Sequence, residues 1–350
     1  KLEDLILIFQ QIIWQIFHQL KEERTISAPF HLLRGKRSGQ TIQDVGIFHL
    51  HRYFGLLPKL SRKTYDEAVN QLVEQNLITV FENGDYTLSN RQIPDKLYPF
   101  DGWHYRGNEH IFFARLSLIV QSLSHKEAGI MGFIPIQKDP HIQKWVRHFL
   151  ISNEYQGGTL QQQLLNEILI SLEQAEVDSI AKEIVIKRLT GYKIPGYTWQ
   201  QLSIYENKEE LDIQLLYISC LHTWLNIIIL NEKEFPLLHK IAEEIRISIP
   251  LSDSAYQTAQ LFKEGYTLEK ISQYRRLKIS TIEDHIVELA MNDPQFSIKQ
   301  FISDEEIEQV LTAVEDYDTR KLKVLREILP HLSYFQIRLV LAKGDTTRAN

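Results

Sequence analysis

Residues 60–88 read LSRKTYDEAVNQLVEQNLITVFENGDYTL, and this stretch carries the clearest structural signals in the chain. Ser61 precedes apolar side chains that recur three and four residues apart, so we predict a helix that Ser61 caps. Residues 77–81 are rich in β-branched side chains and alternate in polarity, which is typical of a strand. Asn83-Gly84 is a strong signal for a tight hairpin turn, and residues 86–88 supply the returning strand.

The residues before this stretch supply two more short helical patterns. They cover residues 26–33 and 47–54, and a basic turn over residues 34–40 separates them. Three helices followed by a hairpin are typical of the winged-helix form of the helix-turn-helix. In that fold the third helix presents its N-terminal turn to nucleic acid, where backbone N–H groups and nearby Arg or Lys bind phosphate.

Basic residues gather in this part of the chain. Residues 31–63 hold seven Lys and Arg and a single acid, Asp44, whereas the whole chain of 350 residues has a formal net charge of −6. Phosphate contacts need local positive charge, so we predict a DNA-binding surface here. Its expected residues are Arg34, Lys36, Arg37, Ser61, Arg62, Lys63 and Thr64. The alternative is a winged helix that contacts protein and has a merely solvated basic surface.

Two breaks divide the rest of the chain. Pro and Gly interrupt residues 91–108, and residues 248–254 read as a loop that ends in helix caps. We therefore predict three domains, 1–98, 99–253 and 254–350, with net charges of +1, −5 and −2. Helical spacing of apolar residues dominates the last two. The expected fold is mostly α, with an N-terminal winged helix carrying a small β-hairpin, a central helical domain and a C-terminal helix-turn-helix bundle.

The last domain shows a second helix-turn-helix pattern. Helices are predicted over residues 255–263 and 268–274, and Ser280 or Thr281 is expected to cap a third helix. Basic residues at the turn before it are further DNA-binding candidates: Arg275, Arg276 and Lys278. Acids are expected on the exposed face of the third helix, where they would repel phosphate: Glu283, Asp284 and Glu288. Reading of the major groove and docking of a partner protein on these acids both stay open. Further helices are predicted over residues 304–317, 319–329 and 333–343.

Motifs that the sequence lacks exclude several functions. It has no G-x-x-x-x-G-K-[ST] phosphate loop, so it cannot power DNA unwinding alone, and we find no other catalytic motif. The single cysteine, Cys220, excludes an internal disulfide, and neither His49 with His51 nor Cys220 with His222 makes a metal site by itself. We therefore expect no catalytic residue, cofactor or metal. Residues 2–20 contain too many polar side chains to span a membrane, so a cytoplasmic, nucleoid-associated protein is expected.

The N-terminal part resembles a known family. In the order of their motifs, residues 25–90 are similar to the RQC winged helix of RecQ-family DNA helicases. The motifs are Leu33-Arg34-Gly35, Thr41-Ile42-Gln43-Asp44-Val45-Gly46, Tyr53-Phe54-Gly55, Leu60-Ser61-Arg62 and Leu77-Ile78. The resemblance implies binding of duplex DNA at a fork, where the hairpin can help to separate base pairs. The hairpin tip here, residues 82–85, has two acids and no aromatic side chain, which does not suit such a separating role.

The C-terminal part carries a second resemblance. Residues 254–343 are similar to the helix-turn-helix module at the C-termini of some RecQ-family helicases. A chain with both parts resembles the YpbB-type proteins of low-GC Gram-positive bacteria, which are encoded beside a short RecQ-type helicase often called RecS. The resemblance implies a non-enzymatic DNA-binding accessory subunit of that helicase, acting in DNA repair and recombination. In that case we expect the helicase to dock on the acidic helical body. A helix-turn-helix transcription regulator and a scaffold that binds only proteins are the alternatives.

Overall fold

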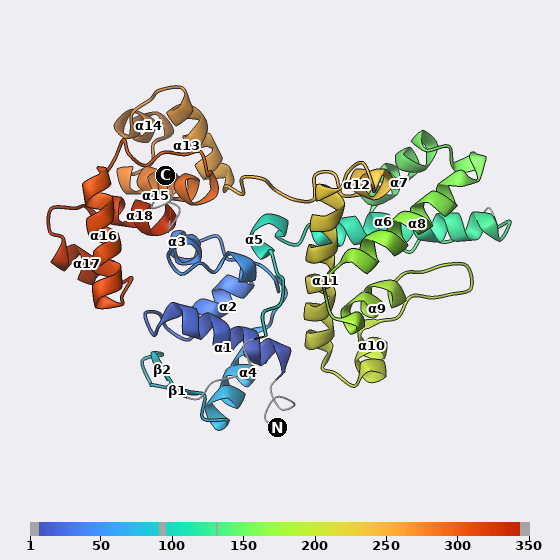
Figure 1. Cartoon of the computed structure of the whole chain (residues 1–350), viewed down its shortest axis with the longest axis horizontal. Helices are drawn as coiled ribbons and strands as arrows, with labels where there is room; N and C mark the ends of the chain where they lie inside the picture. Colours follow the sequence, from blue (N-terminus) through green and yellow to red (C-terminus); the bar gives the residue numbers. More distant parts are fainter. Residues whose placement is uncertain (1–6, 91–95, 131, 344–350) are drawn as a thin grey trace. The chain divides into compact units, whose positions relative to one another are not determined.

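The computed structural model describes residues 7–90, 96–130 and 132–343 (Figure 1). Eighteen α-helices and one two-stranded sheet make up most of the regular structure of these residues, so the prediction of a mostly α fold is confirmed. The chain divides into two compact units. We call residues 1–11 with 93–247 the central unit, and residues 12–92 with 248–350 the terminal unit.

The central unit is built around one buried helix, α11 (Glu210–Leu230). Helices α6, α8, α9 and α10 pack on it, which confirms the predicted helical centre. α11 is long and apolar enough to cross a membrane by length and composition, but most of its side chains are buried inside this unit, as in the core helix of a globular protein. The other helices are α5 (Gly102–Tyr105), α6 (Glu109–Glu127), α7 (Pro140–Ser152), α8 (Thr159–Gln174), α9 (Ser179–Lys187), α10 (Trp199–Glu206) and α12 (Pro236–Ile241).

The N-terminal half of the terminal unit has the order of elements expected for a winged helix. The elements are α1 (Ile8–Leu20), α2 (Ala28–Leu33), α3 (Gly39–Ile47), the short 3-10 helix η1 (His51–Tyr53), α4 (Arg62–Glu74), β1 (Ile78–Val80) and β2 (Tyr86–Leu88). Ser61 caps α4 as predicted, because its hydroxyl accepts a hydrogen bond from the Thr64 N–H at 3.0 Å. The hairpin pairs Ile78 with Leu88 and Val80 with Tyr86, so the predicted strands and turn are confirmed.

Helix α3 lies one segment earlier in the chain than the helix predicted over residues 47–54. It covers Gly39–Ile47 rather than residues 47–54, and Ser38 caps it by accepting from the Thr41 N–H. After it, His49 adopts a positive φ of 54°, which ends the helical path. Four apolar side chains in the predicted stretch are nevertheless buried: Phe48, Leu50, Tyr53 and Phe54. Burial within a turn produced the apolar spacing that we interpreted as helical.

The hairpin lies flat against the end of α1 and the segment that follows it. The Ile26 N–H donates to the Gly84 carbonyl at 2.9 Å, so the tip is tied to the α1–α2 connection. At the base, the Tyr86 hydroxyl donates to the Phe17 carbonyl at 2.8 Å, and the Leu88 N–H donates to Glu22 at 2.6 Å. The hairpin is therefore held at both its tip and its base.

The C-terminal half of the terminal unit is a helical bundle. Its helices are α13 (Asp253–Lys263), α14 (Leu268–Arg275), α15 (Ile279–Asn292), α16 (Asp304–Tyr317), α17 (Leu322–Ile328) and α18 (Tyr334–Lys343). α13, α14 and α15 form the predicted helix-turn-helix, and Thr267 caps α14 as expected. α15 begins two residues earlier than predicted, at Ile279, so Lys278 takes the N-cap position instead of Ser280 or Thr281.

The two halves of the terminal unit share an interface through α3. α3 packs on α15 and α18 at Gly46, where an added Cβ would lie only 2.6 Å from Met291 Sδ. Gln43 Nε2 donates to Asp284 Oδ1 at 2.9 Å across the same interface. Glu23 adds a second contact, since it accepts from the Arg320 N–H at 2.8 Å. Most of the first predicted domain and nearly all of the last therefore fold against each other within one unit.

Candidate nucleic-acid interface

The predicted basic surface centres on the ring of Phe30. The guanidinium carbons of Arg34 and Arg62 lie 5.5 and 5.3 Å from the centroid of this ring, in the geometry of cation–π contacts. One aromatic side chain therefore brings together the turn after α2 and the first residue of α4. Lys36 and Arg37 follow on the same turn, and both are exposed.

Two glycines allow this turn to pack closely on the chain before α4. Gly35 has a φ of +67°, and a Cβ there would lie 3.0 Å from the Gly55 Cα. Arg34 Nε also donates to the Pro58 carbonyl at 3.3 Å. The backbone that carries Arg34 and Lys36 is therefore fixed against the rest of the winged helix, which favours a preformed basic surface.

The basic residues at the start of α4 are partly paired along the helix. Arg62 Nε lies 2.8 Å from an Asp66 carboxylate oxygen, and Lys63 Nζ lies 3.8 Å from Glu67. Both pairs are exposed, so they contribute little to stability and can be exchanged for phosphate at little cost. The N–H groups in the first turn of a helix lack intrahelical acceptors and add a positive end to the dipole.

The one acid within the basic stretch, Asp44, does not face this surface. It is 6% exposed and pairs with Arg24, whose Nε donates to it at 2.9 Å. Burial raises the pKa of Asp44, and the hydrogen bond from Arg24 opposes that rise. The surface formed by residues 31–63 is therefore more basic than the residue count alone suggests.

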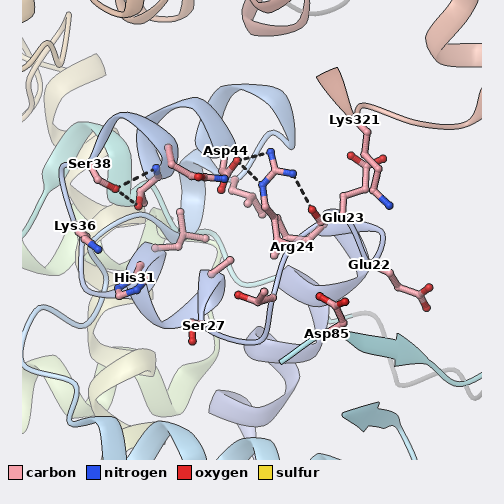
Figure 2. A pocket seen from close by; sticks show the side chains of 17 residues that line it. Glu22, Glu23, Arg24, Ser27, His31, Lys36, Ser38, Asp44, Asp85 and Lys321 are labelled. Atoms are coloured by element: carbon pink, nitrogen blue, oxygen red, sulfur yellow. Dashed lines mark hydrogen bonds and ion pairs between the residues drawn. The ribbon is translucent and has the colours of Figure 1, made fainter. Parts of the chain in front are cut away.

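A cavity of about 590 Å³ in the terminal unit adjoins the basic surface (Figure 2). His31 and Lys36 lie at one end of it, the Arg24–Asp44 pair lies in the middle, and Glu22 and Asp85 lie toward the other end. Burial lowers the pKa of His31, and the charges of Lys36, Arg62 and Arg34 lower it further. His31 therefore lies among these cations and is more readily neutral than a free histidine, although its sequence position gave no reason to single it out.

The hairpin is poorly placed to act as a pin between DNA strands. Asn83 Nδ2 donates to Asp85 at 2.7 Å within the tip, and the tip is tied to Ile26. The ring of Tyr86 is buried against Phe17 with 4.4 Å between centroids. Insertion of the hairpin between DNA strands would require these contacts to break. This agrees with the acidic tip, which also does not suit a separating role.

In the C-terminal half, two of the three predicted basic residues are exposed and one is not available. Arg276 and Lys278 are exposed, at the end of α14 and the N-cap of α15. Arg275 instead donates to the Ser254 carbonyl at 2.6 Å, to the Ser254 hydroxyl at 3.0 Å and to Gln257 at 3.0 Å. The guanidinium of Arg275 therefore holds the start of α13, and the predicted contact with DNA would require it to give up these hydrogen bonds.

The three acids predicted on an exposed face of α15 lie in contacts within the terminal unit. Glu288 is 6% exposed and accepts from the Ser252 N–H at 2.5 Å and its hydroxyl at 2.9 Å. Asp284 contacts Gln43 and Arg338, and Glu283 lies 3.8 Å from Arg338. The expectation of an exposed acidic face is wrong for Glu288, whereas Glu283 and Asp284 are half-exposed, because α3, α13 and α18 pack on α15. Most of α15 is equally inaccessible to a DNA groove.

Three further candidate groups, His222, Glu109 and Cys220, are buried in the central unit. His222 and Glu109 form a buried pair in the central unit, 3.6 Å apart, and His222 Nδ1 accepts from the Asp101 N–H. Cys220 is buried, which raises the pKa of its thiol to about 12. Within the described ranges, no three His, Cys, Asp or Glu side chains gather as a metal site would require.

The fold and its surface thus define a mostly helical helix-turn-helix protein with a basic winged helix. Residues 254–341 match a family described as a helix-turn-helix domain. Over 351 aligned residues the chain is 31% identical to Protein YpbB of Bacillus subtilis (strain 168). This alignment covers 96% of the present chain and 97% of that protein. The chain therefore belongs to the YpbB family. No solved structure matches it.

Proposed function

We propose that this protein is a non-enzymatic DNA-binding accessory subunit of a RecQ-type DNA helicase. The observation that carries the DNA-binding part is the arrangement of Arg34 and Arg62 on one Phe30 ring, beside His31 and Lys36. Side chains of this kind bind phosphate oxygens and position a protein on a duplex without reading its sequence. The subunit would supply a DNA-binding surface to a motor protein during DNA repair and recombination.

Duplex or forked DNA is the substrate that this surface suits. The hairpin is tied down, so separation of strands would be left to the motor protein. α15 is covered along most of its length, which speaks against a transcription regulator that reads two major grooves. We therefore expect similar affinity for duplexes of unrelated sequence.

The DNA-binding proposal is tested by removing the basic group. Arg34, Lys36, Arg37, Arg62 and Lys63 are replaced together by Ala, and binding to a forked duplex is measured at moderate salt. Each lost phosphate contact should make the negative slope of log affinity against log salt concentration shallower by about 0.9. We expect most of the binding to disappear. Affinity within twofold of the wild type would show that this surface does not bind DNA.

We propose that the helicase docks on the surface of the central unit. Its acidic balance suits a basic motor protein, and complementary charge sets encounter rate and orientation. It also exposes Ile204 and Tyr205 on α10, at 74% and 58%, close in sequence to the exposed acids Glu209 and Glu210. Neighbouring exposed apolar side chains suit a protein-binding surface.

Capture of a RecQ-type helicase by the full-length chain, with nuclease present, tests the docking surface. Ile204→Asp should abolish capture, because it places a charge in the apolar contact. Ile151→Asp is the matched control, since Ile151 is 72% exposed on α7 of the same unit. Capture that survives Ile204→Asp but not the five-residue Ala variant would move the docking surface to the winged helix.

A further inference from the structure

The two groups of exposed basic residues in the terminal unit approach each other through Arg37. Arg37 lines a second cavity, of about 280 Å³, together with residues from the C-terminal half of the unit. Ser254 near the start of α13 and Thr281 in the first turn of α15 are among them. Arg37 therefore shares one cavity with the first turn of α15, and the same cavity also reaches Asp284 and Glu288 further along that helix.

The packing of α3 holds Arg37 in this position. Ser38 follows Arg37 directly and caps α3, so the basic turn leads straight into the helix that packs on α15. At Gly39 an added Cβ would lie 3.6 Å from an Asp284 carboxylate oxygen, which shows how near the start of α3 comes to α15. Gln43 bonds to the same Asp284 one turn later. The spacing between Arg37 and the start of α15 is thus set by a packed interface.

The N-terminal end of α15 is the part of that helix that stays open. Lys278, Ile279 and Ser280 are exposed, whereas the residues from Ile282 onward are mostly buried or half-buried. α15 is 14 residues long, so its first turn carries the positive end of a full helix dipole. Arg276 lies two residues before Lys278 and is also exposed. This end of α15 offers the charges of Arg276 and Lys278, and the half-exposed acids Glu283 and Asp284 follow one turn further along the helix.

We propose that the basic residues of both halves form one continuous strip that follows the backbone of a DNA duplex. Arg34 and Arg62 make one end, Arg37 the middle, and Arg276 with Lys278 the other end. The proposal rests on the DNA-binding function proposed above and extends it to the helix-turn-helix half. In this arrangement α15 touches DNA end-on through its first turn and reads no bases, so the whole strip recognises phosphate spacing rather than sequence.

Charge-neutralising pairs at the two ends of the strip test this proposal. One full-length variant carries Arg34→Ala and Arg62→Ala, and a second carries Arg276→Asn and Lys278→Gln. Asn is chosen because Arg276 has a positive φ of 54°, which Asn tolerates well. Lys323→Ala is the control, because Lys323 is an exposed lysine on α17 and lines neither cavity. Thermal melting of each variant verifies that the terminal unit remains folded.

Binding of a labelled 20-bp duplex is measured by fluorescence anisotropy over a series of salt concentrations. We expect the Arg276→Asn/Lys278→Gln pair to lower the salt slope by about 2 and the affinity at least tenfold, as two lost phosphate contacts require. Lys323→Ala should stay within twofold of the wild type. If only Arg34→Ala/Arg62→Ala weakens binding, the strip is refuted while the DNA-binding function stands. If neither pair weakens binding, both proposals fail.

Discussion

Replacement of Glu288 by Ala tests whether this acid supports the fold or binds a partner. Its carboxylate lies inside the terminal unit and accepts two hydrogen bonds from Ser252, which is itself the N-cap of α13. Hydrogen bonds to a charged acceptor contribute about 1.5–3 kcal/mol each and are not additive. The Ser252 N–H would also lose its buried acceptor. We therefore expect Glu288→Ala to lower the free energy of unfolding by about 3 kcal/mol.

This loss can be measured separately for the terminal unit. A change of about 3 kcal/mol corresponds to a roughly 150-fold increase in the open population. Hydrogen exchange followed by mass spectrometry should show that increase in peptides from α13 and α15. Calorimetry should show the melting temperature of this unit falling by about 6–12 °C, the range for a unit of its size.

Two further variants separate hydrogen bonding from charge. Glu288→Gln keeps one carbonyl acceptor for Ser252 and should lose less stability than the Ala variant. Glu305→Ala removes an exposed acid from the first turn of α16, where only a weak dipole interaction of about 0.5 kcal/mol is at stake. The reasoning is refuted if Glu288→Ala unfolds within about 0.5 kcal/mol of the wild type. A helicase-binding defect in a fully stable Glu288→Ala protein would restore the partner-binding interpretation.

Three other outcomes are expected. Gly196→Ala should destabilise the central unit by several kcal/mol, because the new Cβ would lie 2.3 Å from the Arg188 carbonyl oxygen. Gly132→Ala is the control and should be tolerated, because its Cβ meets nothing within 4 Å. Equal melting temperatures for the two variants would contradict this expectation. His31 has a lowered pKa in the free protein, and a bound phosphate should raise that pKa, so DNA affinity should increase as pH falls from 8 to 5.5. His31→Gln should flatten this pH dependence. An unchanged pH profile in the variant would exclude His31 as its source. The purified chain should hydrolyse no ATP with or without DNA, because it has no phosphate loop; DNA-stimulated turnover lost on mutating a residue of this chain would overturn that.

Local signals in the sequence predicted the elements that depend on local chemistry. Ser61 and Thr267 cap their helices as expected, and Asn83-Gly84 forms the hairpin turn. Capping and turn formation involve residues only a few positions apart, so a short stretch contains all the information they need. The stretch 47–54 misled us because buried apolar side chains in a turn imitate helical spacing.

Contacts between distant segments were beyond the reach of the sequence. The sequence pattern predicts Glu288 on the surface, whereas in the structure it accepts a hydrogen bond from Ser252, the N-cap of α13. Arg275 looks like a phosphate ligand until Ser254 is seen to accept from it. Asp284 finds its amide partner at Gln43, more than 200 residues earlier in the chain. Charge and helix position alone cannot distinguish these internal contacts from free side chains, because the deciding neighbour is set by tertiary packing.

The interleaved order of the two units has a consequence for synthesis on the ribosome. Residues 12–92 emerge first, but the segment that covers α3 follows only after residues 93–247 have been made. At about 5–20 residues per second, the face of α3 that carries Gly46 and receives Met291 waits on the order of 10–50 s for its partner. The central unit can complete itself during this delay. A nascent winged helix with this uncovered apolar side is therefore exposed to chaperones, and termination before α15 is made would leave the side open.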